Sequence, residues 1–328
     1  MKKYISVLLA AILMVSCLSA CGLKGESSSA AGNKIQIVTT IFPEYDWVMN
    51  VIGKDSANAE VTMLLDNGVD LHSYQPTAED IMKISNCDLF IYVGGESDEW
   101  VEDALKESTN KDMFVINLLD VLGDSVKEEE IVEGMQGEEE EEESEEEEEV
   151  EYDEHVWLSL KNAVKLTESI SNALQVVDKD NAEKYKQNAE DYISKLNELD
   201  KKYQDAVSAS AKKTVLFGDR FPFRYLVDDY GLSYYAAFVG CSAETEASFE
   251  TITFLSDKVD ELNLGAVMTI EGPDHRIAET IIQNTQNKDQ KILTMDSMQA
   301  TTSKDVKNGS SYLEIMENNL KVLSEALN

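Results

Sequence analysis

Apolar runs alternate with amphipathic stretches in the first half of the chain. Runs rich in β-branched residues predict strands, and apolar residues recurring every three or four positions predict helices. A repeated strand–helix–strand order favours a parallel sheet with right-handed crossovers. The predicted strands are 35–40, 59–65, 88–94 and 113–118, and the predicted helices are 44–53, 76–86 and 97–108.

The second half repeats this scheme after a long polar-apolar stretch. Residues 178–210 contain no proline or glycine, and their apolar residues recur at helical spacing, which predicts a helix on the order of 45 Å long. We therefore expect an α/β protein with two lobes, each a four-stranded, mainly parallel sheet flanked by helices, joined by this long rigid helix. The predicted strands are 213–218, 232–238, 265–270 and 290–295, and the predicted helices are 222–230, 248–262, 274–284 and 311–327.

The N-terminus has the pattern of an export signal. Two lysines precede an apolar run that is too short to span a bilayer, and small residues lead directly into Cys21. The string Leu-Ser-Ala-Cys resembles a bacterial lipobox, which implies cleavage before Cys21 and lipidation of its sulfur. The predicted organisation is a signal peptide (1–20), a flexible tether (21–33), an N-terminal lobe (34–177), a linking helix (178–210) and a C-terminal lobe (211–328).

Net charge and cysteine content restrict the possible partners and disulfides. The formal net charge of −36 argues against binding to nucleic acid or attraction to anionic lipid. Cys87 and Cys241 would remain in the body of the protein, and two cysteines do not make a disulfide framework. Cys87 precedes an apolar strand and is expected to be buried and reduced, and the loop that contains Cys241 is interpreted as structural.

Two of the three histidines lie in places suited to ligand binding. His72 follows the second predicted strand, in GVDLHSYQPTAED, and His155 lies in EYDEHVWLSLKNA. Ligands bind at the carboxyl ends of strands in open α/β sheets, and imidazole is the usual nitrogen ligand for zinc and other transition metals. Taken alone, each histidine is more often an ordinary surface residue.

The motifs TTIFPEYDWVMNVIG, GVDLHSYQPTAEDI, DLFIYVGGESDEW and DEHVWLSLKNA, followed by a long helix and YGL, resemble the zinc/manganese-type metal-binding lipoproteins of bacterial ABC transporters (the cluster A-I solute-binding proteins). The resemblance covers essentially the whole mature chain. It implies a non-enzymatic, monomeric protein, lipid-anchored on the extracytoplasmic face of the cell membrane. It also implies one metal site between the lobes and delivery of the ion to the permease of the same uptake system.

The resemblance also implies the ligands. His72 and His155 match the two N-lobe histidines of the family, and Glu271 matches a C-lobe carboxylate. Alignment on YGL places Arg220 where the family has another ligand, and an arginine cannot coordinate a cation. Asp219 in the same predicted turn is the favoured replacement; a water molecule or His275 are the alternatives.

Zinc is the favoured metal, because two imidazoles with carboxylates suit it and the Irving–Williams order favours it. Manganese is the alternative, since fewer histidines accompany manganese in this family. Two other functions remain open: a surface adhesin, which only the predicted exposure supports, and a metallohydrolase, for which no general base is apparent.

A run of eleven glutamates and one serine occupies 138–149, within an acidic loop predicted over 127–154. Dense like charge is typical of a disordered, solvated loop. The alternative is that the run collects cations electrostatically beside the site. Carboxylates alone are hard ligands that cannot select zinc, so selectivity would then lie in His72 and His155.

Overall fold

The computed structural model describes residues 34–53, 57–137, 151–242 and 245–328. The predicted signal peptide, the tether, Cys21 and the glutamate run lie outside the described residues. Residues Ile35–Asn328 form one compact unit, which is described here. None of the described helices is long and apolar enough to cross a membrane.

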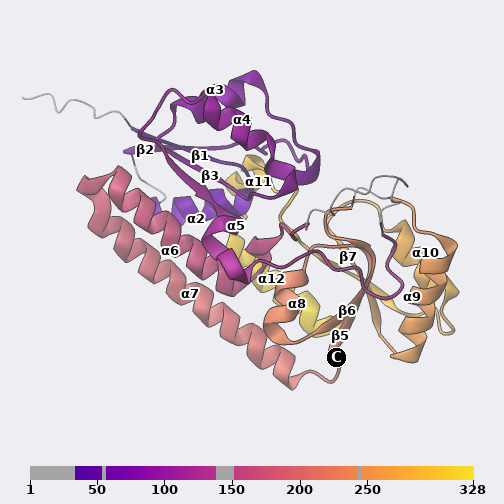
Figure 1. Ribbon diagram of the computed structural model, residues 1–328. Helices are drawn as coiled ribbons and strands as arrows, with labels where there is room; N and C mark the ends of the chain where they lie inside the picture. The colour runs from indigo at the N-terminus through magenta and orange to yellow at the C-terminus, as the bar shows by residue number, and fades with distance from the viewer. Residues whose placement is uncertain (1–33, 54–56, 138–150, 243–244) are drawn as a thin grey trace, which may run out of the picture. The chain divides into compact units, whose positions relative to one another are not determined.

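The N-terminal sheet has four strands in the order β2-β1-β3-β4, and every pairing is parallel. The central strands β1 and β3 are largely buried, as their apolar runs predict. In Figure 1, α3 and α4 lie on one side of this sheet and α2 on the other. The elements are β1 (Ile35–Thr39), α2 (Phe42–Ile52), β2 (Ala59–Met63), α3 (Ala78–Asn86), β3 (Leu89–Tyr92), α4 (Trp100–Lys106), β4 (Phe114–Asn117) and α5 (Leu118–Leu122).

The C-terminal sheet repeats the pattern in the order β6-β5-β7-β8, again with parallel pairings. Helices α9 and α10 pack together on one side of it (Figure 1). The elements are β5 (Thr214–Phe221), α8 (Arg224–Tyr230), β6 (Ser233–Val239), α9 (Phe249–Glu261), β7 (Ala266–Ile270), α10 (Arg276–Asn284), β8 (Lys291–Met295), α11 (Ser303–Lys307) and α12 (Tyr312–Ala326). The two parallel sheets confirm the predicted fold class.

One strand differs from its prediction in a way that affects the site. The strand predicted over 213–218 continues to Phe221 as β5, so Asp219 and Arg220 lie on a strand and not in a turn. The pairing of β5 with β6 shifts register between Phe217 and Arg220. Such an irregularity lets a strand continue while it changes the direction of its side chains.

A long helix connects the two sheets, as predicted. Helix α7 (Ala182–Ala209) has 28 residues and follows a single 3₁₀ turn. Its buried face includes Tyr192 and Tyr203, whose hydroxyls donate to Asp46 of α2 and to the Met316 carbonyl of α12. Helix α6 (Leu160–Val177), which the sequence did not lead us to expect, packs along α7 (Figure 1). Helix α7 therefore contacts elements that precede it and elements that follow it.

Candidate metal site

His72 is positioned by a short turn after β2. The 3₁₀ turn Leu71–Ser73 begins at Asp70, whose carboxylate accepts a hydrogen bond from the His72 backbone N–H at 3.1 Å. Buried Leu71 anchors the turn in the core. The His72 side chain is only 11 % exposed, so its ring is held in the protein instead of extending into solvent.

His155 is positioned by the acidic residues directly before it. Its backbone N–H donates to Asp153 Oδ1 at 2.9 Å, and its ring Nδ1 lies 3.0 Å from the same oxygen. The ring is fully buried. The next residue but one, Trp157, is also buried and donates to the Ser297 carbonyl at 2.9 Å, which ties this segment to the C-terminal half.

The two imidazoles converge. Nε2 of His72 lies 3.2 Å from Nε2 of His155. On the far side of the His72 ring, Nδ1 lies 2.8 Å from Ser97 Oγ and 3.3 Å from Glu154 Oε2. When Nδ1 of His72 carries a proton toward Ser97 and Glu154, and Nδ1 of His155 carries one toward Asp153, the two Nε2 lone pairs face each other. That arrangement is unfavourable unless a cation or a proton lies between them, and a transition-metal ion suits it.

Carboxylates behind the histidines complete this arrangement. Burial alone would raise the pKa of Glu154, but hydrogen bonds from His72 and Ser97 outweigh it and lower the pKa. Burial raises the pKa of neighbouring Asp98 to about 7. Carboxylates that accept from the outer nitrogen of a histidine fix the ring orientation and make the other nitrogen a better metal ligand.

Cys241 joins the histidines from the other sheet. It follows β6, and its sulfur together with one nitrogen from each of His72 and His155 forms a group whose atoms lie within 4.8 Å of one another. Among the described residues, this is the one group of three histidine, cysteine or acidic side chains close enough to hold a metal ion. Burial, with the nearby charges of Glu129 and Asp153, raises the pKa of the thiol.

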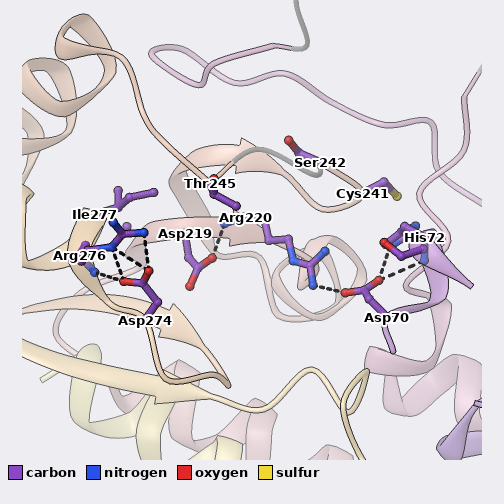
Figure 2. A pocket seen from close by; sticks show the side chains of 12 residues that line it. Asp70, His72, Asp219, Arg220, Cys241, Ser242, Thr245, Asp274, Arg276 and Ile277 are labelled. Carbon is purple, nitrogen blue, oxygen red and sulfur yellow. Dashed lines mark hydrogen bonds and ion pairs between the residues drawn. The ribbon is translucent and has the colours of Figure 1, made fainter. Parts of the chain in front are cut away.

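A cavity of about 430 Å³ adjoins this group and is lined by residues from both halves of the protein. Figure 2 shows Arg220 extending along it to Asp70 beside His72. Asp70 lies in an ion pair with Arg220. Burial alone would raise the pKa of Asp70, but the charge of Arg220, together with His72 and the hydrogen bonds that Asp70 accepts from both, lowers it. Arg220 therefore neutralises the Asp70 carboxylate next to His72.

Asp219 lines the same cavity but does not belong to the group of three. Its two oxygens accept backbone hydrogen bonds, from Arg220 at 2.9 Å and from Ile270 at 3.2 Å. In Figure 2 it lies beside Arg220, farther along the cavity from His72 than Asp70. Burial raises its pKa. Its role as a ligand stays a prediction.

Glu271 follows β7, as predicted, but lines a second cavity of about 340 Å³ with Asp296. Its carboxylate accepts from the Ser297 backbone N–H at 2.6 Å and from the Ser297 hydroxyl at 2.7 Å. The structure therefore does not bring Glu271 together with the two histidines, and its ligand role also stays a prediction. His275 lies at the start of α10 and is likewise outside the group.

Two residues near the histidines were not expected from the sequence. The sequence favours a structural role for the loop that contains Cys241, because this loop leads into the next predicted helix. Gln299 is buried, and when its amide donates to Asp70 at 2.8 and 3.0 Å, its oxygen lies 3.2 Å from His155 Nε2. The signal available for Cys241 was its position just after a predicted strand, where ligands of open α/β sheets gather.

The first described part of the acidic loop, 127–137, contacts the C-terminal sheet. Gln136 donates to the Ala237 carbonyl at 2.9 Å, and the Cys241 backbone N–H donates to Glu129 at 3.3 Å. The Tyr225 hydroxyl accepts from the Lys127 backbone N–H at 3.0 Å. This portion is therefore held against the C-terminal half, beside the candidate site.

The protein has two lobes, each with a parallel sheet flanked by helices, and a long helix connects them. Together with the two converging imidazoles, this fold is that of a metal-binding protein of the solute-binding class. The family model for the zinc-uptake complex component A, periplasmic, matches residues 37–326, and the chain belongs to this family. It is a family of uptake components and not of enzymes, in agreement with the prediction.

Individual relatives support the assignment. The chain is 32% identical over 329 residues to a zinc-binding lipoprotein AdcA of Streptococcus pneumoniae, covering 99% of this chain and 61% of AdcA. It therefore spans about three-fifths of the length of that relative. It is 31% identical over 322 residues to the high-affinity zinc uptake system protein ZnuA of Bacillus subtilis, covering 98% and 96%. The Zn(II)-bound ZnuA-like domain of S. pneumoniae AdcA superposes with a TM-score of 0.69, at 29% identity, covering 90% of this chain and 99% of that domain.

Proposed function

We propose that this protein captures zinc outside the cytoplasm and delivers it to the permease of an ABC transporter for import. The observation that carries the proposal is the 3.2 Å approach of the His72 and His155 Nε2 atoms, each ring supported from behind by a carboxylate. Relatives named for zinc binding and zinc uptake support the choice of zinc. Nitrogen ligands and the Irving–Williams order favour zinc over manganese.

Two further parts of the proposal rest on the N-terminal sequence and on the family. We infer that Cys21 carries a lipid that holds the protein on the extracytoplasmic face of the membrane, as the lipobox-like string suggests. A Cys21→Ser variant is expected to be released from the membrane fraction. The protein acts as a monomer that meets its permease while anchored. A dimer at working concentration in sedimentation experiments would contradict this.

Metal binding is tested by replacing one converging histidine. Purified protein is expected to bind about one zinc ion per chain tightly, and His72→Ala is expected to abolish this binding. His275→Ala is the matched control, because His275 is a histidine outside the group of three. Isothermal titration and metal analysis give the affinity and stoichiometry. Equal affinity and stoichiometry in wild type and His72→Ala would reject the site.

Delivery is tested in cells. A strain that lacks this protein is expected to grow poorly under zinc limitation, and the wild-type protein, but not the His72→Ala variant, is expected to restore growth and zinc uptake. Normal zinc-limited growth of the deletion strain, in the absence of a second zinc uptake system, would contradict a role in import.

A further inference from the structure

We propose that the thiolate of Cys241 is a metal ligand, so that the site is a mixed nitrogen–sulfur site formed by His72, His155 and Cys241. This inference rests on the proposed function, because it concerns the donors of the same site. It also specifies the substrate class: a thiolate is a soft donor that favours zinc and disfavours manganese, whose preferred ligands are oxygens.

The first argument is distance. Tetrahedral zinc with Zn–N bonds of about 2.0–2.1 Å and Zn–S bonds of about 2.3 Å requires ligand atoms roughly 3.3–3.6 Å apart. The two Nε2 atoms already lie 3.2 Å apart. The Cys241 sulfur belongs to the same group, within 4.8 Å. Because the sulfur and one nitrogen of each histidine lie within 4.8 Å of one another, a displacement on the order of 1 Å brings their separations to the tetrahedral values.

The second argument is that the backbone is built to bring Cys241 close to His155. A Cβ atom at Gly240 would lie 2.9 Å from the His155 Cε1 and 3.0 Å from the Phe221 carbonyl oxygen, so the chain passes here without room for a side chain. The Cys241 backbone N–H is also held, because it donates to Glu129 on the acidic segment. The residue after the glycine is therefore fixed beside the imidazole.

The third argument is that the nearby charged side chains are already engaged. Arg220 pairs with Asp70, Asp219 accepts two backbone hydrogen bonds, and Glu271 is held by Ser297. The carboxylates of Asp70, Asp219 and Glu271 would have to give up these partners to reach the ion. The sulfur, which hydrogen-bonds to Glu129, already belongs to the group. On binding, the S–H bond breaks, the proton passes to solvent, and the sulfur lone pair forms the bond to the metal, with no oxidation or reduction.

The test compares Cys241→Ser with Cys87→Ala as the matched control, because Cys87 is the buried thiol of the other sheet. Cys241→Ser is expected to weaken zinc binding by about 100-fold. Loss of a residue that only supports a ligand costs about 10–100-fold, so the expected effect lies at the upper end of that range. Its manganese affinity is expected to change little, so the preference for zinc falls. Cys87→Ala is expected to keep the wild-type preference.

A spectroscopic measurement reports on the sulfur directly. Protein loaded with Co²⁺ is expected to show a thiolate-to-cobalt charge-transfer band in the near ultraviolet, which persists in Cys87→Ala and disappears in Cys241→Ser. Because serine is close in size to cysteine, Cys241→Ser is expected to fold; should it fail to fold, the presence or absence of the band in wild type and Cys87→Ala decides the question.

The outcomes separate the two proposals. If wild type binds no zinc, the proposed function fails and the thiolate proposal fails with it. If wild type binds zinc and His72→Ala does not, but Cys241→Ser retains wild-type zinc affinity and cobalt spectrum, the thiolate proposal alone is overturned. A loss of zinc preference together with loss of the charge-transfer band supports it.

Discussion

The Arg220 guanidinium of β5 forms an ion pair with Asp70, the residue that caps the turn carrying His72. The pair joins the C-terminal sheet to the segment that positions a candidate ligand. The family resemblance leads us to expect a ligand at position 220; the arginine there cannot coordinate a cation and pairs with Asp70 instead. Both side chains are 21% exposed, so the pair is only partly screened by solvent.

Removing the arginine charge should therefore weaken both stability and metal binding. Arg220→Met leaves Asp70 partly buried without its partner, and we expect a loss on the order of 1–3 kcal/mol in the free energy of unfolding. Zinc affinity should fall about tenfold, because the turn that carries His72 loses support. Chemical denaturation and calorimetric titration measure the two effects.

A double-mutant cycle supplies the control for this prediction. Asp70→Asn combined with Arg220→Met should cost less than the sum of the single changes, because the residues interact directly. Lys202→Met is the control, because it breaks an exposed ion pair between Lys202 and Glu317, whose side chains are 60% and 51% exposed. It should change the free energy of unfolding by less than about 1 kcal/mol. Additive effects of the two site variants would show that the pair contributes no coupling energy.

The carboxylate behind His155 gives a second prediction. Asp153→Ala removes the oxygen 3.0 Å from the His155 Nδ1, so the ring loses its fixed orientation. We expect zinc affinity to fall about 10–100-fold with unchanged stoichiometry. Asp153→Asn keeps an oxygen acceptor and should cost less. Asp257→Ala, on the exposed side of α9, is the control; a loss of affinity of the same size in that variant would mean that the effect is not local to His155.

The regular elements could be predicted from the sequence because their causes are local. Buried parallel strands need continuous apolar runs, and those runs mark β1, β3 and β7 within a residue or two. Thr77 and Asp80 form a capping box at the start of α3, a pattern of neighbouring residues. The 3.6-residue spacing of apolar side chains predicts the long helix α7, and the apolar face of this helix is buried.

The candidate site could be predicted only in part, because its members are far apart in sequence. Motif context singled out His72 and His155, whereas Cys241 approaches them through the end of β6 and the space left by Gly240. The continuation of β5 through Arg220 depends on a register shift against β6, which no local pattern indicates. Glu271 was placed correctly at the end of β7, but its hydrogen bonds to Ser297 come from a segment after another strand.

A buried carboxyl group predicts how stability depends on pH. Burial, reinforced by the charge of Asp98, raises the pKa of Glu44 from 4.5 to about 8 in the folded protein. The folded state therefore holds a proton that the unfolded state releases at lower pH. This contribution to stability is fully present below about pH 4.5 and is lost as the pH rises toward 8, with a slope approaching about 1.4 kcal/mol per pH unit.

Glu44→Gln should remove the Glu44 contribution and leave that of Asp98, whose pKa burial also raises. Glutamine is neutral at every pH, and its side-chain oxygen can still accept from the Thr40 N–H that bonds to Glu44 at 2.8 Å. Urea denaturation of metal-free protein at several pH values between 5 and 8 measures the slope. Glu190→Gln, on the exposed side of α7, should keep the wild-type slope. An unchanged slope in Glu44→Gln would mean that this carboxyl group is ionised throughout the range.

The glutamate run gives a kinetic prediction. Its described flanks lie next to the candidate site: on one side Glu129 accepts from the Cys241 backbone, and on the other Asp153 supports His155. A dense negative charge attached there attracts cations to the site without coordinating them selectively. Deleting 138–149 should leave zinc affinity at equilibrium nearly unchanged and slow zinc capture at low ionic strength, where charge attraction is strongest.

Stopped-flow measurement with a fluorescent zinc competitor gives the capture rate. A variant with all eleven glutamates of the run changed to glutamine keeps the length of the segment and removes its charge. If charge attraction is the cause, this variant and the deletion should slow capture equally, and the difference from wild type should shrink as salt is added. A deletion that slows capture while the glutamine variant does not would assign the effect to the length of the segment, and an unchanged rate in both would leave the run without a role in capture.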